Sequence, residues 1–245
     1  MKSMIFAAGL GTRLRPLTND RPKALVEVKG KPLLQYSIEA LIKAGSTEII
    51  INVHHFADLI ENFLTKKNNF GIRIEISDER EKVLETGGGL KKAQWFFNDG
   101  APFLLCNVDV LTNMDLKAFY NAHPPSGTLA TLAVRNRPSS RYLLFDKNNR
   151  LIGWENVTNH TRQSLPQSRM PQKKNIQHLA FSGIHVLSPR IFEYMPPEDK
   201  FSIIEVYLRA MDKETIRAYP HDTDNWLDVG RPESLMEAEK QVNGD

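Results

Sequence analysis

The stretch Met4–Val28 decides the fold, and it reads MIFAAGLGTRLRPLTNDRPKALVEV. Its first residues, Met4–Ala8, are apolar and predict a buried strand. Gly9 and Gly11 follow, and glycine lets a backbone approach a ligand closely and adopt positive φ. Arginines and a lysine come soon after these glycines. A glycine loop with free N–H groups and nearby cations is suited to binding a polyphosphate.

Two well-known phosphate-binding loops fit this stretch poorly. A Walker A loop ends in Gly-Lys-Ser/Thr, whereas Gly11 is followed by Thr12 and Arg13. A dinucleotide-binding loop needs a third glycine, and Leu14 stands at that position. Pro16 also argues against a long helix directly after the loop. A tight turn with solvated arginines is the structural alternative.

The spacing of glycines and cations resembles the signature of the sugar-1-phosphate nucleotidylyltransferases. That signature runs Gly-x-Gly-Thr-Arg-Leu and then Pro-Lys, and here it begins at Gly9 and ends at Lys23. The resemblance implies that Arg13 and Lys23 are catalytic. Arg13 would clamp the β- and γ-phosphates of a nucleoside triphosphate, and Lys23 would lie near the α-phosphate or the sugar phosphate. Arg15 and Arg21 are explained equally well as solvated surface residues.

The composition is that of an ordinary globular protein. Of the 245 residues, 41% are hydrophobic and 25% are charged. The net charge of +3 is too small to favour nucleic acid as a partner, and no apolar run suggests a membrane span. Cys106, the single cysteine, excludes an internal disulfide and a multi-cysteine zinc site. The N-terminal apolar run is too short for a signal peptide, so we expect a cytoplasmic protein.

Apolar periodicity predicts strands that alternate with helices in the first half of the chain. Strands are expected at 4–8, 48–53, 72–76, 103–106 and 129–134, and helices at 32–45, 56–66, 87–97 and 115–123. This alternation indicates parallel βαβ units, which bind ligands at the carboxyl ends of their strands. Gly9, His54, Gly87 and Asp109 all lie at or just after such ends.

The second half of the chain is richer in predicted strands. Strands are expected at 142–146, 151–154, 179–187, 215–219 and 225–227, and helices at 201–211 and 233–242. The polar segment Asn159–Lys174 predicts a mobile surface loop. We therefore expect one domain over residues 1–245, with a Rossmann-like, three-layer α/β nucleotidyltransferase fold. Its sheet would be mixed and mostly parallel, with residues 1–135 binding mainly the nucleotide and 136–245, a small β-rich lobe, mainly the sugar.

Two aspartates that follow strands are candidate metal ligands. Asp109 follows the apolar run that starts at Phe103, and Asp228 lies in the segment WLDVG of residues 226–230. Mg²⁺ binds through one or two protein carboxylates together with phosphate oxygens and water. The resemblance implies that both aspartates hold Mg²⁺. A helix cap or a turn is the structural alternative for each.

The nucleotide is expected to contact mainly backbone groups. The candidates are Ala7, Ala8, Gly9, Gly11, Thr12, His54, Glu85, Thr86 and Gly87. A structural role explains His54 equally well, and the glycines 87–89 also fit a turn that starts a helix. Many relatives place a glutamine before the Thr-Gly segment, where this chain has Ser77-Asp78-Glu79-Arg80. The identity of the base, uracil or guanine, therefore stays open.

The sugar is expected to contact residues of both halves. The candidates are Asn107, Glu155, Asn156 and Gly183. Asn107 lies two residues before Asp109, and Gly183 would let a sugar ring approach the backbone. A plain structural role explains each of these residues equally well.

Three segments resemble most closely the N-acetylmuramate-1-phosphate uridylyltransferases of bacterial cell-wall recycling. They are LETGGG at 84–89, FSGI at 181–184 and WLDVG at 226–230. Mannose- and heptose-1-phosphate guanylyltransferases are close rivals, so the expected substrates are UTP or GTP and a sugar-1-phosphate. The chain ends soon after its last expected helix, so we expect no left-handed β-helix, and a monomer or weak dimer.

Two other classes of function remain as alternatives. A glycosyltransferase often carries Asp-x-Asp for its metal, whereas this chain has Asn107-Val108-Asp109, and that function leaves the arginine-rich loop unexplained. A non-catalytic nucleotide-sugar binding protein needs no second metal ligand. The presence of both Asp109 and Asp228 therefore favours an enzyme.

Overall fold

A computed structural model describes residues 1–241 of the chain. Among these residues, ten strands form one sheet: β1 (Lys2–Phe6), β4 (Glu48–Val53), β5 (Arg73–Asp78), β6 (Phe103–Asn107), β8 (Ala130–Arg135), β9 (Arg141–Phe145), β10 (Leu151–Asn156), β11 (Thr161–Ser164), β12 (Gln177–Leu187) and β13 (Ile216–Pro220). Two small ribbons pair β2 (Glu27–Val28) with β3 (Lys31–Pro32), and β7 (Val110–Thr112) with β14 (Trp226–Asp228).

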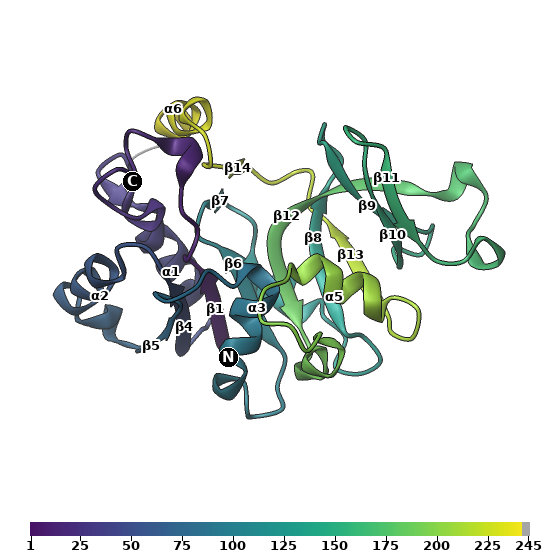
Figure 1. Ribbon diagram of the computed structural model, residues 1–245, viewed down its shortest axis with the longest axis horizontal. Helices are drawn as coiled ribbons and strands as arrows, with labels where there is room; N and C mark the ends of the chain where they lie inside the picture. The colour runs from purple at the N-terminus through teal and green to yellow at the C-terminus, as the bar shows by residue number, and fades with distance from the viewer. Residues whose placement is uncertain (242–245) are drawn as a thin grey trace.

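The sheet has a parallel core, and its second half is mainly antiparallel, although β13 runs parallel to β8. Its order is β11-β10-β9-β12-β6-β1-β4-β5, with β8 joined to β12 and β13 joined to β8. β1 runs parallel to both β4 and β6, and β4 runs parallel to β5. β12 runs antiparallel to β6, β8 and β9. The predicted mixed α/β fold is confirmed, with parallel pairing concentrated in the first half (Figure 1).

Helices cover both faces of the sheet. They are α1 (Leu33–Lys43), α2 (Ala57–Lys66), α3 (Glu85–Lys92), α4 (Leu116–Asn121), α5 (Ile203–Ala210) and α6 (Pro232–Gln241). Side chains of a strand alternate between faces, so Ile5 packs with α1 and α2 on one face while Met4 and Phe6 pack with α3 and α5 on the other. One apolar cluster lies on each face of the sheet, so the sheet is enclosed between two layers of helices, giving the three layers that the sequence predicts.

Several predicted boundaries need correction. The segment Asn159–Lys174 contains strand β11, which pairs with β10 and was missed because its side chains are mostly exposed and show no apolar alternation. The helix predicted from Gly87 begins at Glu85. The last predicted helix is present as α6, and its expected final residue, Val242, lies outside the described residues. None of the helices within residues 1–241 combines the length and apolar character needed to cross a membrane.

The glycines at the start of α3 are required for close packing. A Cβ on Gly87 would lie 2.4 Å from the Phe201 ring, and a Cβ on Gly88 would lie 1.9 Å from the Asp199 carbonyl oxygen. A Cβ on Gly89 would lie 2.6 Å from a carboxylate oxygen of Glu79. Helix α3 therefore presses against a backbone segment that is more than a hundred residues later in the chain, and only glycine fits there.

We expect Gly88→Ala to lower the free energy of unfolding by about 1–3 kcal/mol, because an added methyl group must displace backbone. Urea denaturation measures this change. Gly9→Ala is a matched control, since nothing lies within 4 Å of a Cβ at Gly9. Equal stability of the two variants would contradict the packing role of Gly88.

Candidate active site

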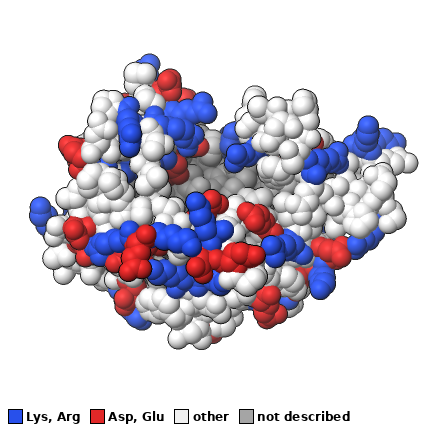
Figure 2. Space-filling model, viewed as in Figure 1, with Lys and Arg blue, Asp and Glu red and all other residues white. Residues whose placement is uncertain are grey.

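A cavity of about 370 Å³ lies at the carboxyl ends of β1, β4 and β6. Its lining consists of Phe6, Ala7, Ala8, Gly9, Lys23, Asn52, Glu79, Val83, Glu85, Thr86, Asn107, Val108 and Asp109. Five of the predicted nucleotide residues, one predicted sugar residue, Lys23 and one predicted metal ligand thus share one cavity. Figure 2 shows this face of the molecule hollowed near its centre, with Lys and Arg side chains on both sides of the hollow.

The ribbon of β7 and β14 brings the two aspartates together. Asp228 pairs with Val110, and the Val229 N–H donates to the Asp109 carbonyl oxygen at 2.8 Å. The Asp109 carboxylate accepts a hydrogen bond from Lys23 Nζ. Residues 119 positions apart in the sequence are therefore neighbours at one end of a short antiparallel ribbon.

Arg13, Lys23 and Asp228 converge on Gly230. A Cβ at Gly230 would lie 2.7 Å from Asp228 Oδ1, 2.9 Å from Arg13 Nη2 and 3.3 Å from Lys23 Nζ. A side chain at this position would therefore enter the space that these charged groups share. Since Lys23 also binds Asp109, all four predicted catalytic and metal residues form one charged centre.

The charged side chains of this centre lie close to one another, and this proximity affects the pKa of Asp228. Desolvation, together with the nearby Asp109 carboxylate, raises the pKa of Asp228, although the residue itself is exposed. Lys23 and Arg13 act in the opposite direction on the same pKa. The side chain of Lys23 is 10% exposed, so its contact with Asp109 is largely screened from water. A cation beside Asp109 and Asp228 would offset the repulsion that helps to raise the pKa of Asp228.

The donor set fits Mg²⁺ better than a transition metal. Within residues 1–241, no group of three or more His, Cys, Asp or Glu side chains is arranged to hold a metal ion. Asp109 and Asp228 would supply two carboxylate oxygens and leave the other positions to phosphate and water. Mg²⁺ commonly binds in this way at nucleotide sites.

Asn52 and Glu79 are buried polar residues of the cavity that the sequence analysis missed. Asn52 Oδ1 accepts from the Ala7 N–H at 2.7 Å, and Asn52 Nδ2 donates to Glu79 Oε1 at 2.7 Å. Glu79 Oε2 accepts from the Leu84 N–H at 3.1 Å, and burial raises the pKa of Glu79. The pair therefore links the glycine loop to the start of α3 and fixes the cavity wall. The sequence gives one indication of this pair, because Asn52 is the single asparagine in the isoleucine-rich strand β4.

Asn52→Ala should lower the free energy of unfolding by about 2–5 kcal/mol, because the Ala7 N–H and a Glu79 carboxylate oxygen lose buried partners. The KM for the nucleotide should rise with it, since the cavity wall loosens. Ser77→Ala is the matched control: Ser77 is also buried, and within the described chain its hydroxyl has no hydrogen-bond partner. Chemical denaturation of both variants measures the difference, and equal losses would refute the role of Asn52.

Four predicted nucleotide residues lie outside the cavity lining. Gly11 has φ of +64°, and a Cβ there would lie 3.1 Å from Lys23 Cβ, so Gly11 lets Lys23 approach the loop. Thr12 is exposed and begins a 3₁₀ turn that ends at the buried Leu14. His54 Nδ1 pairs with the Glu79 carbonyl oxygen at 2.6 Å, and the Gly87 N–H donates to the Phe201 carbonyl oxygen at 2.9 Å. The nitrogen atoms of His54 and Gly87 named here thus already have partners in the protein.

The predicted sugar residues fall into two groups. Gly183 has φ of +78°, and a Cβ there would lie 2.7 Å from Asn107 Nδ2, so β12 and the end of β6 meet closely at this point. Glu155 Oε1 pairs with His178 Nδ1 at 2.5 Å, and Asn156 Oδ1 accepts from the Thr158 N–H at 3.0 Å. Asn107 and Gly183 therefore adjoin the cavity, whereas Glu155 and Asn156 lie on β10 outside its lining.

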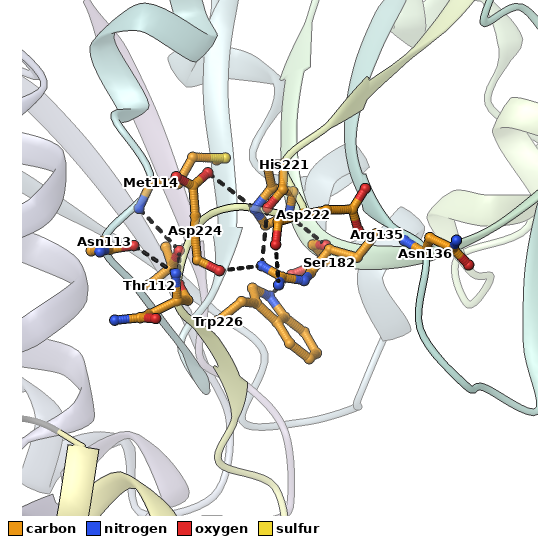
Figure 3. A network of polar contacts seen from close by, with 11 residues as sticks. Thr112, Asn113, Met114, Arg135, Asn136, Ser182, His221, Asp222, Asp224 and Trp226 are labelled. Atoms are coloured by element: carbon orange, nitrogen blue, oxygen red, sulfur yellow. Dashed lines mark hydrogen bonds and ion pairs between the residues drawn. The ribbon is translucent and has the colours of Figure 1, made fainter.

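Arg135, at the end of β8, braces the segment that leads to Asp228 (Figure 3). Its guanidinium donates to the carbonyl oxygens of His221 at 3.0 Å, Asp222 at 3.0 Å and Asp224 at 2.6 Å. The Asp222 carboxylate accepts from the Asn136 N–H at 2.7 Å. Asp222 thus belongs to a loop that hydrogen bonds from β8 and from Asn136 hold in place before β14 begins.

Trp226 is anchored by the same network. Its Nε1–H donates to the Ser182 carbonyl oxygen at 3.0 Å, and the Ser182 hydroxyl pairs with His221 Nε2 at 2.7 Å. On the other side, Thr112 Oγ1 donates to the Asn225 carbonyl oxygen at 2.7 Å. Figure 3 shows these side chains gathered around one loop. The entry to β14 is therefore tied to both β7 and β12.

Comparison with known proteins identifies the family of the chain. Residues 2–244 match the family described as Nucleotidyl transferase. The chain is 33% identical to the N-acetylmuramate alpha-1-phosphate uridylyltransferase of Caulobacter vibrioides, covering 98% of this chain and 96% of that one. The enzyme of the same name from Neisseria meningitidis is also 33% identical, covering 98% and 97%. Among solved structures, HddC from Yersinia pseudotuberculosis complexed with GMP-PN has a TM-score of 0.75 and 25% identity, covering 99% of each chain. The chain therefore belongs to the nucleotidyl transferase family and is a sugar-1-phosphate nucleotidyltransferase.

Proposed function

We propose that this enzyme transfers a uridylyl group from UTP to N-acetylmuramate-1-phosphate and releases pyrophosphate. The observation that carries the proposal is the likeness, along nearly the whole chain, to two uridylyltransferases named for that substrate. The charged centre of Arg13, Lys23, Asp109 and Asp228 supplies the groups that such a reaction needs. This activity would give the enzyme a role in recycling cell-wall sugars.

The chemistry is an in-line displacement at the α-phosphorus of UTP. A phosphate oxygen of the sugar-1-phosphate forms the new P–O bond, and the bond between the α-phosphorus and the bridging oxygen breaks. The electron pair leaves with pyrophosphate. Because the attacking phosphate is already an anion, no general base is needed, and catalysis depends on positioning and charge stabilisation.

Each charged residue has a separate part in this scheme. Arg13 holds the β- and γ-phosphates, where its planar fork suits two oxygens. Lys23, fixed by Asp109, places a point charge near the α-phosphate and the sugar phosphate. Asp109 and Asp228 would hold Mg²⁺, which neutralises charge on the phosphates when it is bound.

The remaining site assignments divide between the two halves of the chain. The backbone of Ala8 and Gly9, with Glu85 and Thr86, would contact the nucleotide in residues 1–135. Asn107 with Gly183 would contact the sugar, and the second half would supply Asp228. The amide of Ala7 already donates to Asn52, so Ala7 would contribute its carbonyl oxygen.

A grid of pyrophosphate-release assays tests the proposal. UTP, GTP, dTTP, CTP and ATP are each combined with the 1-phosphates of N-acetylmuramate, N-acetylglucosamine, glucose, mannose and a heptose, all with Mg²⁺. The expected result is one dominant combination, UTP with N-acetylmuramate-1-phosphate. Preference for N-acetylglucosamine-1-phosphate, which lacks the lactyl group, would refute the sugar assignment and leave the uridylyl assignment intact.

A guanylyltransferase acting on mannose- or heptose-1-phosphate is the second candidate. The likeness to HddC complexed with GMP-PN favours it, since that structure is matched over 99% of this chain. A dominant GTP column in the same grid would select this function.

A further inference from the structure

A second cavity, of about 480 Å³, opens beside Asp228. Its lining includes Arg13, Arg137, Trp226, Asp228, Arg231 and Glu237. The arginines come from three separate parts of the chain: the glycine loop, the connection between β8 and β9, and the residue before α6. Such convergence of guanidinium groups indicates a site for an anion.

The arginines of this cavity are not neutralised by the protein. Within residues 1–241, neither Arg13, Arg137 nor Arg231 forms an ion pair with a carboxylate. The acidic residues of the lining are Asp228, whose charge the proposed Mg²⁺ would offset, and Glu237. The cavity therefore carries an excess of positive charge that a polyanionic ligand would balance.

Arg137 is held in place before any ligand binds. Its guanidinium lies 4.4 Å from the centre of the Trp226 ring, and Nη2 donates to the Phe181 carbonyl oxygen at 3.3 Å. Trp226 is itself fixed through its hydrogen bond to Ser182. Burial lowers the pKa of Arg137 and the nearby Asp228 raises it, but an arginine remains cationic at neutral pH. A partly buried guanidinium on a rigid aromatic platform is well placed to bind an anion without further ordering.

We propose that Arg137, in the connection between β8 and β9, contacts the pyrophosphate end of the nucleotide. Arg13 would then hold the same phosphates from the loop, and Arg231 would complete the basic lining. Arg137 becomes a substrate-binding residue contributed by the second half of the chain. The inference extends the proposed function, because it concerns the leaving group of that reaction.

The contents of the cavity favour pyrophosphate over the sugar. Arg13 and Asp228, which we assign to phosphates and metal, line it, whereas none of the sugar candidates Asn107, Glu155, Asn156 and Gly183 does. The acidic group of N-acetylmuramate is the other anion available in the proposed reaction. It would need the sugar to lie against Arg137, whereas Asn107 lines the first cavity and not this one.

Calorimetry of inorganic pyrophosphate with Mg²⁺ tests the inference on the intact protein without needing turnover. Arg137→Gln should raise the Kd for pyrophosphate about tenfold, the scale of one lost charge-assisted hydrogen bond, and Arg137→Lys should raise it less. Arg209→Gln, an exposed arginine of α5 outside both cavities, is the matched control and should bind as wild type does. In the reverse reaction, the KM for pyrophosphate should rise in Arg137→Gln while the KM for the nucleotide sugar stays unchanged.

Two results would overturn the inference. One is an unchanged Kd for pyrophosphate in Arg137→Gln or Arg137→Lys with a wild-type melting temperature. The other is weaker binding of N-acetylmuramate-1-phosphate with unchanged binding of pyrophosphate, which would assign Arg137 to the acid group of the sugar. A protein that transfers no nucleotidyl group yet shows Arg137-dependent pyrophosphate binding would refute the proposed function and support this inference.

Discussion

Replacing either Asp109 or Asp228 with alanine is expected to lower kcat at least about a hundredfold, the scale of losing one electrostatic contributor to a transition state. Both carboxylates lie in the charged centre: Asp109 accepts a hydrogen bond from Lys23, and Asp228 lies beside Arg13 and Lys23 at Gly230. Steady-state kinetics with saturating Mg²⁺ measure the loss. The dependence on Mg²⁺ should shift to higher concentration in Asp228→Asn, which keeps the shape of the side chain.

Asp58→Asn is the control for this experiment. Asp58 lies in the first turn of α2 with its side chain 85% exposed, and it pairs with Arg80. It should retain wild-type kinetics. Near-normal activity of either Asp109→Ala or Asp228→Ala would remove that residue from the proposed metal site.

Arg13→Ala is expected to reduce kcat/KM about a hundredfold or more, because a guanidinium that stabilises charge on the leaving pyrophosphate is lost. The absence of a side chain at Gly230 leaves room for the Arg13 guanidinium, since a Cβ at position 230 would lie 2.9 Å from Arg13 Nη2. The loss should appear in kcat as well as in KM, since charge on the pyrophosphate grows during the reaction.

Arg15→Ala is the matched control for the loop. Arg15 is exposed and lies outside the lining of both cavities, although it is only two residues from Arg13. Its replacement should change kcat/KM by less than about threefold, as expected for a solvated surface charge. If Arg15→Ala lowers kcat/KM more than Arg13→Ala does, binding of the β- and γ-phosphates has been assigned to the wrong arginine.

The features that the sequence predicted well are local. Gly9, Gly11, Arg13 and Lys23 lie within one short stretch, and Asp109 follows an apolar strand, so residue type and spacing indicate their place at a sheet edge. The parallel core follows from strands that alternate with amphipathic helices.

The features that it missed depend on contacts between distant segments. Asn52 meets Glu79 only because β4 and β5 pair in parallel with Asn52 opposite Ser77. Gly87 was predicted to bind nucleotide, but its amide donates to Phe201, a residue of a segment far along the chain. The role proposed for Arg137 could not be predicted either, because it depends on a contact with Trp226, which lies 89 positions later in the chain. Motif spacing carries no information about such pairings.

The proposed activity is tested most directly by following the reaction of UTP with N-acetylmuramate-1-phosphate and Mg²⁺ by ³¹P NMR. UDP-N-acetylmuramate and pyrophosphate should appear in equal amounts, and Asp228→Asn should form neither at a comparable rate. Formation of no nucleotide sugar from UTP with any of the tested sugar-1-phosphates would refute the proposed activity. Full activity of the Asp228→Asn variant would contradict the role of Asp228 in it.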